Sequence, residues 1–432
     1  MGAAPHRYVA QIARENGGFV RFRVLHRSFV ACANAEAIRH ILVGNHENYP
    51  RAFHSLNGVV VFGNGLIFNE GDGWLARRRM ILPSLRTESV HGLCAISNQE
   101  TLKILDEWQA SSLAGEPVDL LLQIHRLTIS VMGRALLTSG VDREESDAFA
   151  DAIRESVILL RQRNRSLYNP PTWVPTLHNR RLKSVQRTLD GFIERHLKAR
   201  ESMPEVDYPD DILSHMLRVR DPETGEAIPR GDLIVETKTL FAAGFETTGA
   251  SLTWCIYLLA KHPEVAAKWR QEVDTVLEGG EPTTGNIARL EYTAAIVHEA
   301  LRIYPPVHGL SRDALADDEI SGMKIYAGDT ILLSLFGVHH DPGDWESPTE
   351  FRPERFLPGS AWKRESFIPF SVGKHRCIGN VFAQTEMLVA LSLIAQRFEL
   401  SLPDGFEVGE DAFITLTPNR KIPLSVHARP RP

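Results

Sequence analysis

Apolar residues recur every three to four positions along most of this 432-residue chain, which is the period of an α-helix with one buried face. The pattern predicts helices at residues 96–108, 118–137, 180–200, 232–262, 292–304 and 378–398. The helix at 232–262 is the longest, and Pro263 ends it because proline cannot continue a helix. At about 1.5 Å per residue, this helix would cross most of a domain.

Strand-like segments are short and lie toward the two ends of the chain. Residues 19–24 and 29–33 have the pattern of a hairpin, and residues 331–335 have that of a buried strand. Proline and glycine predict loops at 168–173, 220–231 and 341–361. Because strands and helices do not alternate and no linker interrupts the chain, we expect a mainly α fold with small β-sheets, forming a single domain over residues 1–432.

Composition narrows the class of protein. The chain has 48 Lys and Arg against 54 Asp and Glu, a net charge of −6, so its overall charge gives no reason to expect nucleic-acid binding. The four cysteines have no short-spaced pairs, which argues against a disulfide framework or a zinc site. The longest uncharged apolar run, residues 247–260, is too short to span a bilayer, and no signal peptide is visible. We expect a cytoplasmic monomer without a membrane anchor.

Cys377 differs from the other cysteines because of the segment around it, FSVGKHRCIG at residues 370–379, which precedes a predicted helix. A thiolate that binds iron needs backbone N–H donors, a tight turn and protection from water. Gly373 and Gly379 allow close backbone approach and unusual backbone angles, the helix N-terminus favours the anion, and Phe370 can shield it. We expect the remaining cysteines to be small buried hydrophobic residues: Cys32, Cys94 and Cys255.

The middle of the long helix has the unusual sequence Ala243-Gly244-Phe245-Glu246-Thr247. A glycine inside a helix costs about 1 kcal/mol relative to alanine. The Thr247 hydroxyl could bond back to the Ala243 carbonyl and loosen the helix, so that small residues form a groove over a flat cofactor. By itself, the segment is more typical of a core helix whose small residues serve packing.

Two further motifs contain side chains that can pair. Glu299 and Arg302 are three residues apart on an apolar helix and share one face, and Arg355 follows in a Pro-Glu-Arg-Phe segment. Trp74 and Arg78 are four residues apart and also share a face. Each spacing alone is typical of a solvated surface.

The motifs WxxxR, AGxET, ExxR, PERF and FxxGxxxCxG occur once each, and their order and separations resemble those of cytochromes P450. The resemblance extends from about Tyr8 to Leu416 and implies the P450 fold, with the long central helix over a haem b and Cys377 as its axial thiolate ligand. It implies that the haem is also bound by Trp74, Arg78, Arg312, His375, Phe370, Gly379, Ala243 and Gly244.

The same resemblance assigns two groups of residues that do not ligate the haem. Glu246 and Thr247 would be the catalytic acid–alcohol pair that relays protons during activation of O2. Glu299, Arg302 and Arg355 would form a structural triad that locks the segment leading to the Cys loop. A buried ion network of this kind fixes conformation more than it adds stability.

The resemblance also implies an apolar substrate pocket, suited to a fatty acid, a terpenoid or a similar molecule. Its predicted walls are Phe53 and Leu66, Phe241 and Ala243, Val307 and Leu310, and Ile414 and Leu416. Because the chain has no flavin or iron–sulfur segment, electrons from NAD(P)H would arrive through a ferredoxin or flavodoxin with its reductase. Four basic residues are candidates for docking this partner: Arg77, Arg79, Lys374 and Arg376.

Three functions are compatible with these motifs. The first is a soluble, bacterial-type monooxygenase that inserts one oxygen atom from O2 into an apolar molecule. The second is a peroxide-dependent or rearranging haem enzyme, against which Glu246 and Thr247 argue. The third is a haem or ligand carrier without catalysis, against which a complete relay beside a complete ligand loop argues.

Overall fold

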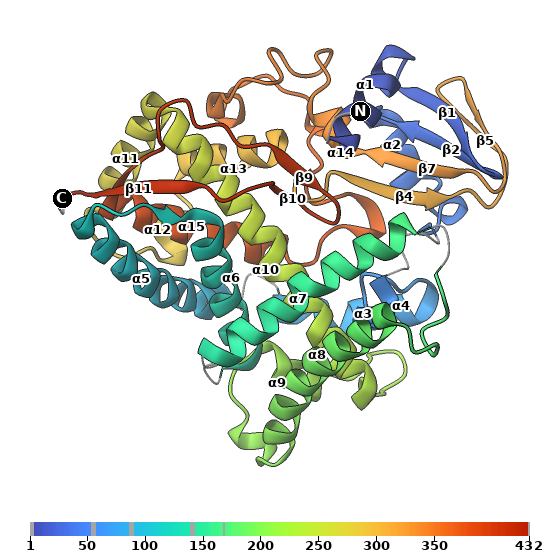
Figure 1. Cartoon of the computed structure of the whole chain (residues 1–432), viewed down its shortest axis with the longest axis horizontal. Coiled ribbons are helices and arrows are strands. Elements are labelled where there is room, and N and C mark those ends of the chain that lie inside the picture. The colour runs from blue at the N-terminus through green and yellow to red at the C-terminus, as the bar shows by residue number, and fades with distance from the viewer. Residues whose placement is uncertain (1–3, 53–57, 86–89, 139–142, 167–168, 431–432) are drawn as a thin grey trace. The chain divides into compact units, whose positions relative to one another are not determined.

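A computed structural model describes residues 4–52, 58–85, 90–138, 143–166 and 169–430, and the secondary structure is mainly helical (Figure 1). The helices are α1 (Pro5–Glu15), α2 (Ala35–Arg39), α3 (Val59–Phe62), α4 (Gly71–Ile81), α5 (Val90–Ala114), α6 (Leu120–Leu137), α7 (Arg143–Arg165), α8 (Leu177–Glu201), α9 (Ile212–Arg218), α10 (Arg230–Lys261), α11 (Pro263–Leu277), α12 (Thr284–Ile287), α13 (Glu291–Ile303), α14 (Leu335–His339) and α15 (Asn380–Arg397). The expected mainly α fold with small sheets is confirmed.

Among the described residues, the strands form four small sheets. Their bounds are β1 (Phe19–Val24), β2 (Arg27–Cys32), β3 (Val118–Asp119), β4 (Gly309–Asp313), β5 (Asp318–Ile320), β6 (Met323–Ile325), β7 (Thr330–Ser334), β8 (Phe398–Ser401), β9 (Glu410–Ala412), β10 (Leu416–Pro418) and β11 (Pro423–Ala428). The largest sheet has the order β1-β2-β7-β4, in which β2 and β7 run parallel and the other neighbours antiparallel. The other sheets are β3-β11-β8, β9-β10 and β5-β6.

The chain groups into two compact units. The first unit is Met1–Ala52, Ser97–Leu127 and Thr247–Pro432, and the second unit is Phe53–Ile96 and Thr128–Glu246. Three of the four boundaries fall inside helices, namely α5, α6 and α10, and the fourth follows Ala52. The single-domain organisation over residues 1–432 stays a prediction.

The four-stranded sheet contributes buried apolar residues to a hydrophobic cluster of the first unit. In Figure 1 its strands lie side by side, and α1 and α2 lie next to them. Val30 of β2 pairs with Ile331 of β7, and both side chains are fully buried against Ile38 of α2. Strand β7 lies between β2 and β4, and its continuous apolar run, residues 331–333, is typical of the buried strand that the sequence predicts.

Aromatic rings form the core of the second unit. Phe149 of α7 lies 4.6 Å from Phe192 of α8 and 4.4 Å from Phe241 of α10, measured between ring centroids. Helices α7 and α8 lie side by side in Figure 1. Helices α7 and α11 are among those not predicted from the sequence, because α7 is rich in charged residues and α11 follows Pro263 directly, where we expected only a helix end. Proline is well tolerated at that first helical position.

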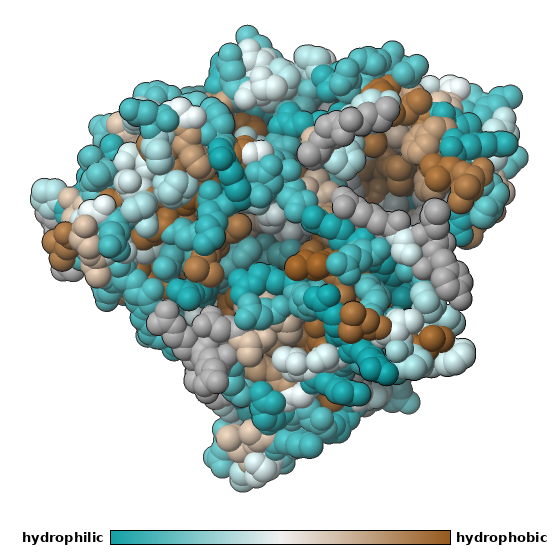
Figure 2. All heavy atoms as spheres, in the orientation of Figure 1, coloured by the Kyte–Doolittle hydropathy of each residue, from teal (hydrophilic) through white to brown (hydrophobic). Residues whose placement is uncertain are grey.

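The surface seen in Figure 2 is mostly hydrophilic, with hydrophobic residues in scattered groups. Within the described part of the chain, α6 is the one helix whose length and hydropathy would suffice to cross a membrane. Most of that stretch, 61%, is buried inside the protein, which is also typical of a helix in a protein core.

The N-terminal helix is docked through a buried histidine cluster. The His6 ring lies edge-on 4.7 Å from Phe336, on which His340 stacks at 4.0 Å. His6 also bonds to the Glu410 carboxylate at 2.8 Å, and its ring lies 5.5 Å from that of His308. Burial lowers the pKa of His308 to about 4 and that of His340 to about 3. Both rings are therefore neutral in the folded protein.

These two histidines predict an acid-sensitive stability. In the unfolded chain a histidine titrates near pH 6.5, so below that pH the unfolded state binds protons that folded His308 and His340 do not. The free energy of unfolding should fall as the pH is lowered from 6.5 toward 4, by up to about 1.4 kcal/mol per pH unit for each histidine.

Denaturant titrations between pH 4.5 and 7.5 measure this slope. The double variant His308→Gln/His340→Gln should have a shallower slope than the parent, whereas replacement of the exposed His26 by Gln should leave it unchanged. An equal slope in the parent and the double variant would contradict the assignment.

Candidate functional site

The Cys loop is a tight turn closed by backbone hydrogen bonds in the first unit. The Cys377 N–H donates to the Phe370 carbonyl at 2.9 Å, and the Arg376 N–H donates to the Gly373 carbonyl at 3.1 Å. Ser371 has φ +58°, a left-handed conformation that is uncommon outside glycine. Helix α15 begins at Asn380, so Cys377 stands just before the positive end of a helix, as the sequence predicts.

Gly373 is the residue of this loop that has to be a glycine. Its φ is +74°, and a Cβ there would lie 2.1 Å from the Leu42 carbonyl oxygen in the π-helical turn His40–Gly44. Gly379 differs from the expectation, since its φ is −94° and a Cβ would meet no atom within 4 Å. The expected unusual backbone is therefore correct for Gly373 and wrong for Gly379.

The π-helical turn is anchored by one carboxylate. Asp318 accepts hydrogen bonds from the Tyr49 hydroxyl at 2.6 Å, His40 at 2.9 Å and Asn45 at 3.0 Å. Burial raises the pKa of Asp318, but these hydrogen bonds outweigh burial and bring it down to about 2. The carboxylate is thus ionised and holds the backbone that Gly373 approaches.

Exposure separates Cys377 from the other three cysteines, all of which lie in the described part of the chain. Cys32, Cys94 and Cys255 are buried, and Cys377 is exposed. Burial raises the pKa of Cys32 and of Cys255 to about 12, so these thiols stay protonated. The expectation that they are structural hydrophobic residues is confirmed.

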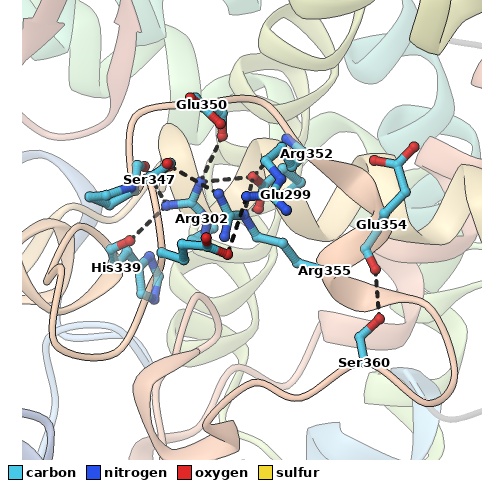
Figure 3. Close-up of polar contacts among 11 residues, drawn as sticks. Glu299, Arg302, His339, Ser347, Glu350, Arg352, Glu354, Arg355 and Ser360 are labelled. Carbon is cyan, nitrogen blue, oxygen red and sulfur yellow. Dashed lines mark hydrogen bonds and ion pairs between the residues drawn. The ribbon is translucent and has the colours of Figure 1, made fainter.

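Glu299, Arg302 and Arg355 form one buried network in the first unit (Figure 3). Arg302 binds both Glu299 oxygens, at 2.7 and 2.8 Å, and Arg355 Nε donates to Glu299 at 3.2 Å. The remaining Arg302 donors reach three backbone carbonyls, those of His339, Pro348 and Glu350. The network therefore fastens α13 to the irregular chain that leads to the Cys loop.

In the first unit, Arg51 links two of the predicted haem-binding residues, Arg312 and His375, and was not itself predicted from the sequence. Arg51 forms a β-bridge with Arg312, and its guanidinium donates to His375 Nδ1 at 2.9 Å. Since arginine can only donate, Nδ1 is the acceptor and the proton of a neutral His375 is on Nε2. Arg51 belongs to no motif, and only the pairing of chain segments reveals it.

Trp74, Arg78 and Leu66 meet within the second unit. The Trp74 indole N–H donates to the Leu66 carbonyl at 3.1 Å, and the Arg78 guanidinium lies 5.5 Å from the centre of the Trp74 ring. The single donor of the indole is therefore engaged by backbone, and Arg78 is the better placed of the two to bind a carboxylate.

The central helix α10 is continuous through the acid–alcohol pair. Ala243, Gly244, Glu246 and Thr247 are half-buried, and the boundary between the units falls between Glu246 and Thr247. A Cβ on Gly244 would lie 2.7 Å from the Met132 side chain of α6. Packing against α6 therefore explains this glycine, and its role beside a cofactor stays a prediction.

The predicted pocket walls have different surroundings. Phe241 is buried in the aromatic core of its unit, and Leu416 is fully buried, with its N–H bound to the Pro306 carbonyl at 2.9 Å. Packing alone explains these two residues. Leu66 is buried, Ile414 is 41% exposed, and the residues of intermediate exposure are Ala243, Val307 and Leu310. Phe53 lies outside the described residues.

Two of the four expected docking residues are neutralised by neighbours. Arg77 pairs with Asp232 at 2.7 Å, and Arg79 pairs with Asp221 at 2.8 Å, both within the second unit. Lys374 and Arg376 in the Cys loop are exposed. Among the four expected docking residues, the two that are exposed therefore lie in the Cys loop.

The donor set of the first unit fits a haem. An exposed thiol on a closed turn suits an iron ligand, and the guanidinium groups of Arg51 and Arg312 with the His375 imidazole suit the two carboxylates of a porphyrin. When bound, the haem would be held by Cys377 at its iron and by these side chains at its carboxylates.

The close approach at Gly373 predicts a severe effect of a single methyl group. In Gly373→Ala the Cβ must displace the Leu42 backbone, and we expect a loss of about 2–4 kcal/mol in the free energy of unfolding. Gly405→Ala is the matched control, because Gly405 also has a positive φ, +66°, but nothing lies within 4 Å of a Cβ there. Denaturant titration measures both, and equal losses would contradict a steric role for Gly373.

Comparison with known proteins agrees with this geometry. The sequence matches the family model "Cytochrome P450" over residues 1–423. From Streptomyces melanosporofaciens, cyclooctat-9-en-7-ol 5-monooxygenase is 31% identical over 87% of this chain and 80% of its own length, and cyclooctatin synthase is 28% identical over 98% and 92%. Cytochrome P450 4F6 of Rattus norvegicus is 30% identical over 80% of this chain and 68% of its own length. The chain therefore belongs to the cytochrome P450 family, and its activity is that of a monooxygenase.

Proposed function

We propose that this protein inserts one oxygen atom from O2 into an apolar small molecule, a terpenoid, a fatty acid or a similar compound. The observation that supports the haem-thiolate chemistry most directly is the closed turn that presents the exposed Cys377 just before α15. The relative named for cyclooctat-9-en-7-ol, an unsaturated alcohol by its name, supports an apolar carbon skeleton as the substrate.

Each group of residues has a distinct task in this proposal. A bound haem supplies the oxygen-activating chemistry, and the protein supplies binding, orientation and protons. Cys377 holds the iron, while Arg312 and His375 hold the carboxylates together with Arg78. The apolar walls at Leu66, Val307, Leu310 and Ile414 exclude water, and the Thr247 hydroxyl passes on protons that Glu246 collects from solvent.

The electrons come from a separate protein in this proposal, a ferredoxin or flavodoxin whose reductase oxidises NAD(P)H. The exposed Lys374 and Arg376 support docking of an acidic partner at the Cys loop. Four cysteines without a disulfide suit a reducing cytoplasm, which we propose as the location, with the protein acting as a monomer.

The ligand assignment predicts a spectroscopic signature. The haem-loaded protein, reduced and exposed to carbon monoxide, should show the red-shifted Soret band of thiolate-bound iron, and Cys377→Ser should lose it. Cys94→Ala is the control, because Cys94 is buried in α5 and should leave the band unchanged. A folded parent protein that never develops the band would contradict the proposed function.

The proton relay predicts uncoupling in Thr247→Ala. NAD(P)H oxidation should continue with a surrogate ferredoxin system, while product per NAD(P)H falls severalfold and hydrogen peroxide accumulates. Thr248→Val is the matched control, because the buried Thr248 hydroxyl makes no hydrogen bond among the described residues. Fully coupled product formation by Thr247→Ala would count against the relay and reopen the peroxide-dependent alternative.

A further inference from the structure

In the second unit, residues 61–66 run from the end of α3 into irregular chain, and buried side chains hold their backbone. The Leu66 N–H donates to the Glu236 carboxylate of α10 at 3.0 Å, and the Leu66 carbonyl accepts from the Trp74 indole at 3.1 Å. At the other end of the segment, Lys238 Nζ donates to the Val61 carbonyl at 3.0 Å. Side chains thus take the place that a neighbouring strand would have in a sheet.

Glu236 is the centre of these contacts. Its side chain is fully buried, and besides Leu66 it binds Arg77 Nη1 at 3.2 Å. Arg77 in turn donates to the Asn64 carbonyl at 2.7 Å and pairs with Asp232. Burial raises the pKa of Glu236, while the Leu66 N–H and the Arg77 charge act in the opposite direction.

Burial of a carboxylate costs free energy of desolvation, and an apolar side chain of similar size often stabilises a fold equally well. A carboxylate adds geometric specificity, because its hydrogen bonds are strong only when the donors lie at particular distances and angles. The contact between Glu236 and Leu66 therefore specifies where the segment lies rather than how tightly the unit packs.

The segment has little room to shift. A Cβ on Gly63, which has φ +79°, would lie 2.8 Å from the Val235 side chain, and a Cβ on Gly65 would lie 2.7 Å from the Thr239 hydroxyl. Both glycines let the backbone of residues 61–66 rest directly on α10. The position of Leu66 is therefore coupled to the side chain of Glu236 without any intervening flexible group.

We propose that Glu236 is a positioning residue that sets the size of ligand the substrate site accepts, by fixing the position of the predicted wall residue Leu66 through its peptide N–H. The inference rests on the proposed function, in which Leu66 belongs to that wall. Glu236 acts through Leu66 and does not itself contact the ligand.

Two azole probes test this in the haem-loaded protein. Imidazole and 4-phenylimidazole bind iron through the same kind of nitrogen, so the ratio of their dissociation constants, measured by spectral titration, reports the room around the ligand. Glu236→Met should change this ratio by about tenfold, and the conservative Glu236→Gln by less. Hydrogen exchange of the amides at residues 61–66 should become about tenfold faster in Glu236→Met.

Asp211→Asn is the matched control. Asp211 is a buried acid of the same unit that pairs with Arg200 at 2.8 Å, and its carboxylate also accepts hydrogen bonds from the Thr138 hydroxyl and the Ser214 N–H. It should leave both the azole ratio and the exchange of residues 61–66 unchanged.

Three results would overturn the proposal: unchanged exchange in both Glu236 variants, faster exchange with an unchanged azole ratio, or the same changes in Asp211→Asn. If the proposed function is wrong, the outcome differs, because the parent protein would then show no azole-induced spectral shift. In that case the exchange measurement still decides whether Glu236 holds the segment.

Discussion

The conformation of the first unit depends on one buried ionised carboxylate and the donors that pair with it. The Glu299 carboxylate, fully buried on α13, accepts from Arg302, from Arg355 and from the Arg352 N–H at 3.0 Å. An unpaired carboxylate in that place would cost several kcal/mol, so the three partners are obligatory once the acid is there. Arg302 also binds the carbonyl of His339 at the end of α14 and those of Pro348 and Glu350 in the chain that follows, so a segment with little regular secondary structure acquires one conformation.

The same device appears in the second unit and beside the π-helical turn. Glu236 orders residues 61–66, and Asp318 orders the turn against which Gly373 packs. In each case a carboxylate accepts hydrogen bonds from a segment outside the α-helices and sheets, and these bonds fix the conformation of that segment. The helices supply most of the apolar burial, and the acids place the segments between them.

Much of this architecture is predictable from the sequence, because long periodic segments and short motifs are local signals. The predicted helix at 232–262 is α10 within two residues, and the predicted strand at 331–335 is β7 within one. Charged α7 was missed because its apolar stripe is narrow beside its many ionised residues. Arg51 was missed because its place beside His375 arises from pairing with a strand far along the chain. The close contact of Gly244 with Met132 is likewise a property of two helices together.

The pairing of β2 with β7 has a consequence for biosynthesis. The parallel ladder joins Phe29 to Thr330 and Cys32 to Leu333, so the first strands leave the ribosome long before their partner exists. Contacts of such sequence separation slow folding and leave apolar strand edges exposed in the meantime. The nascent N-terminal hairpin therefore lacks its parallel partner until about 300 more residues have been synthesised.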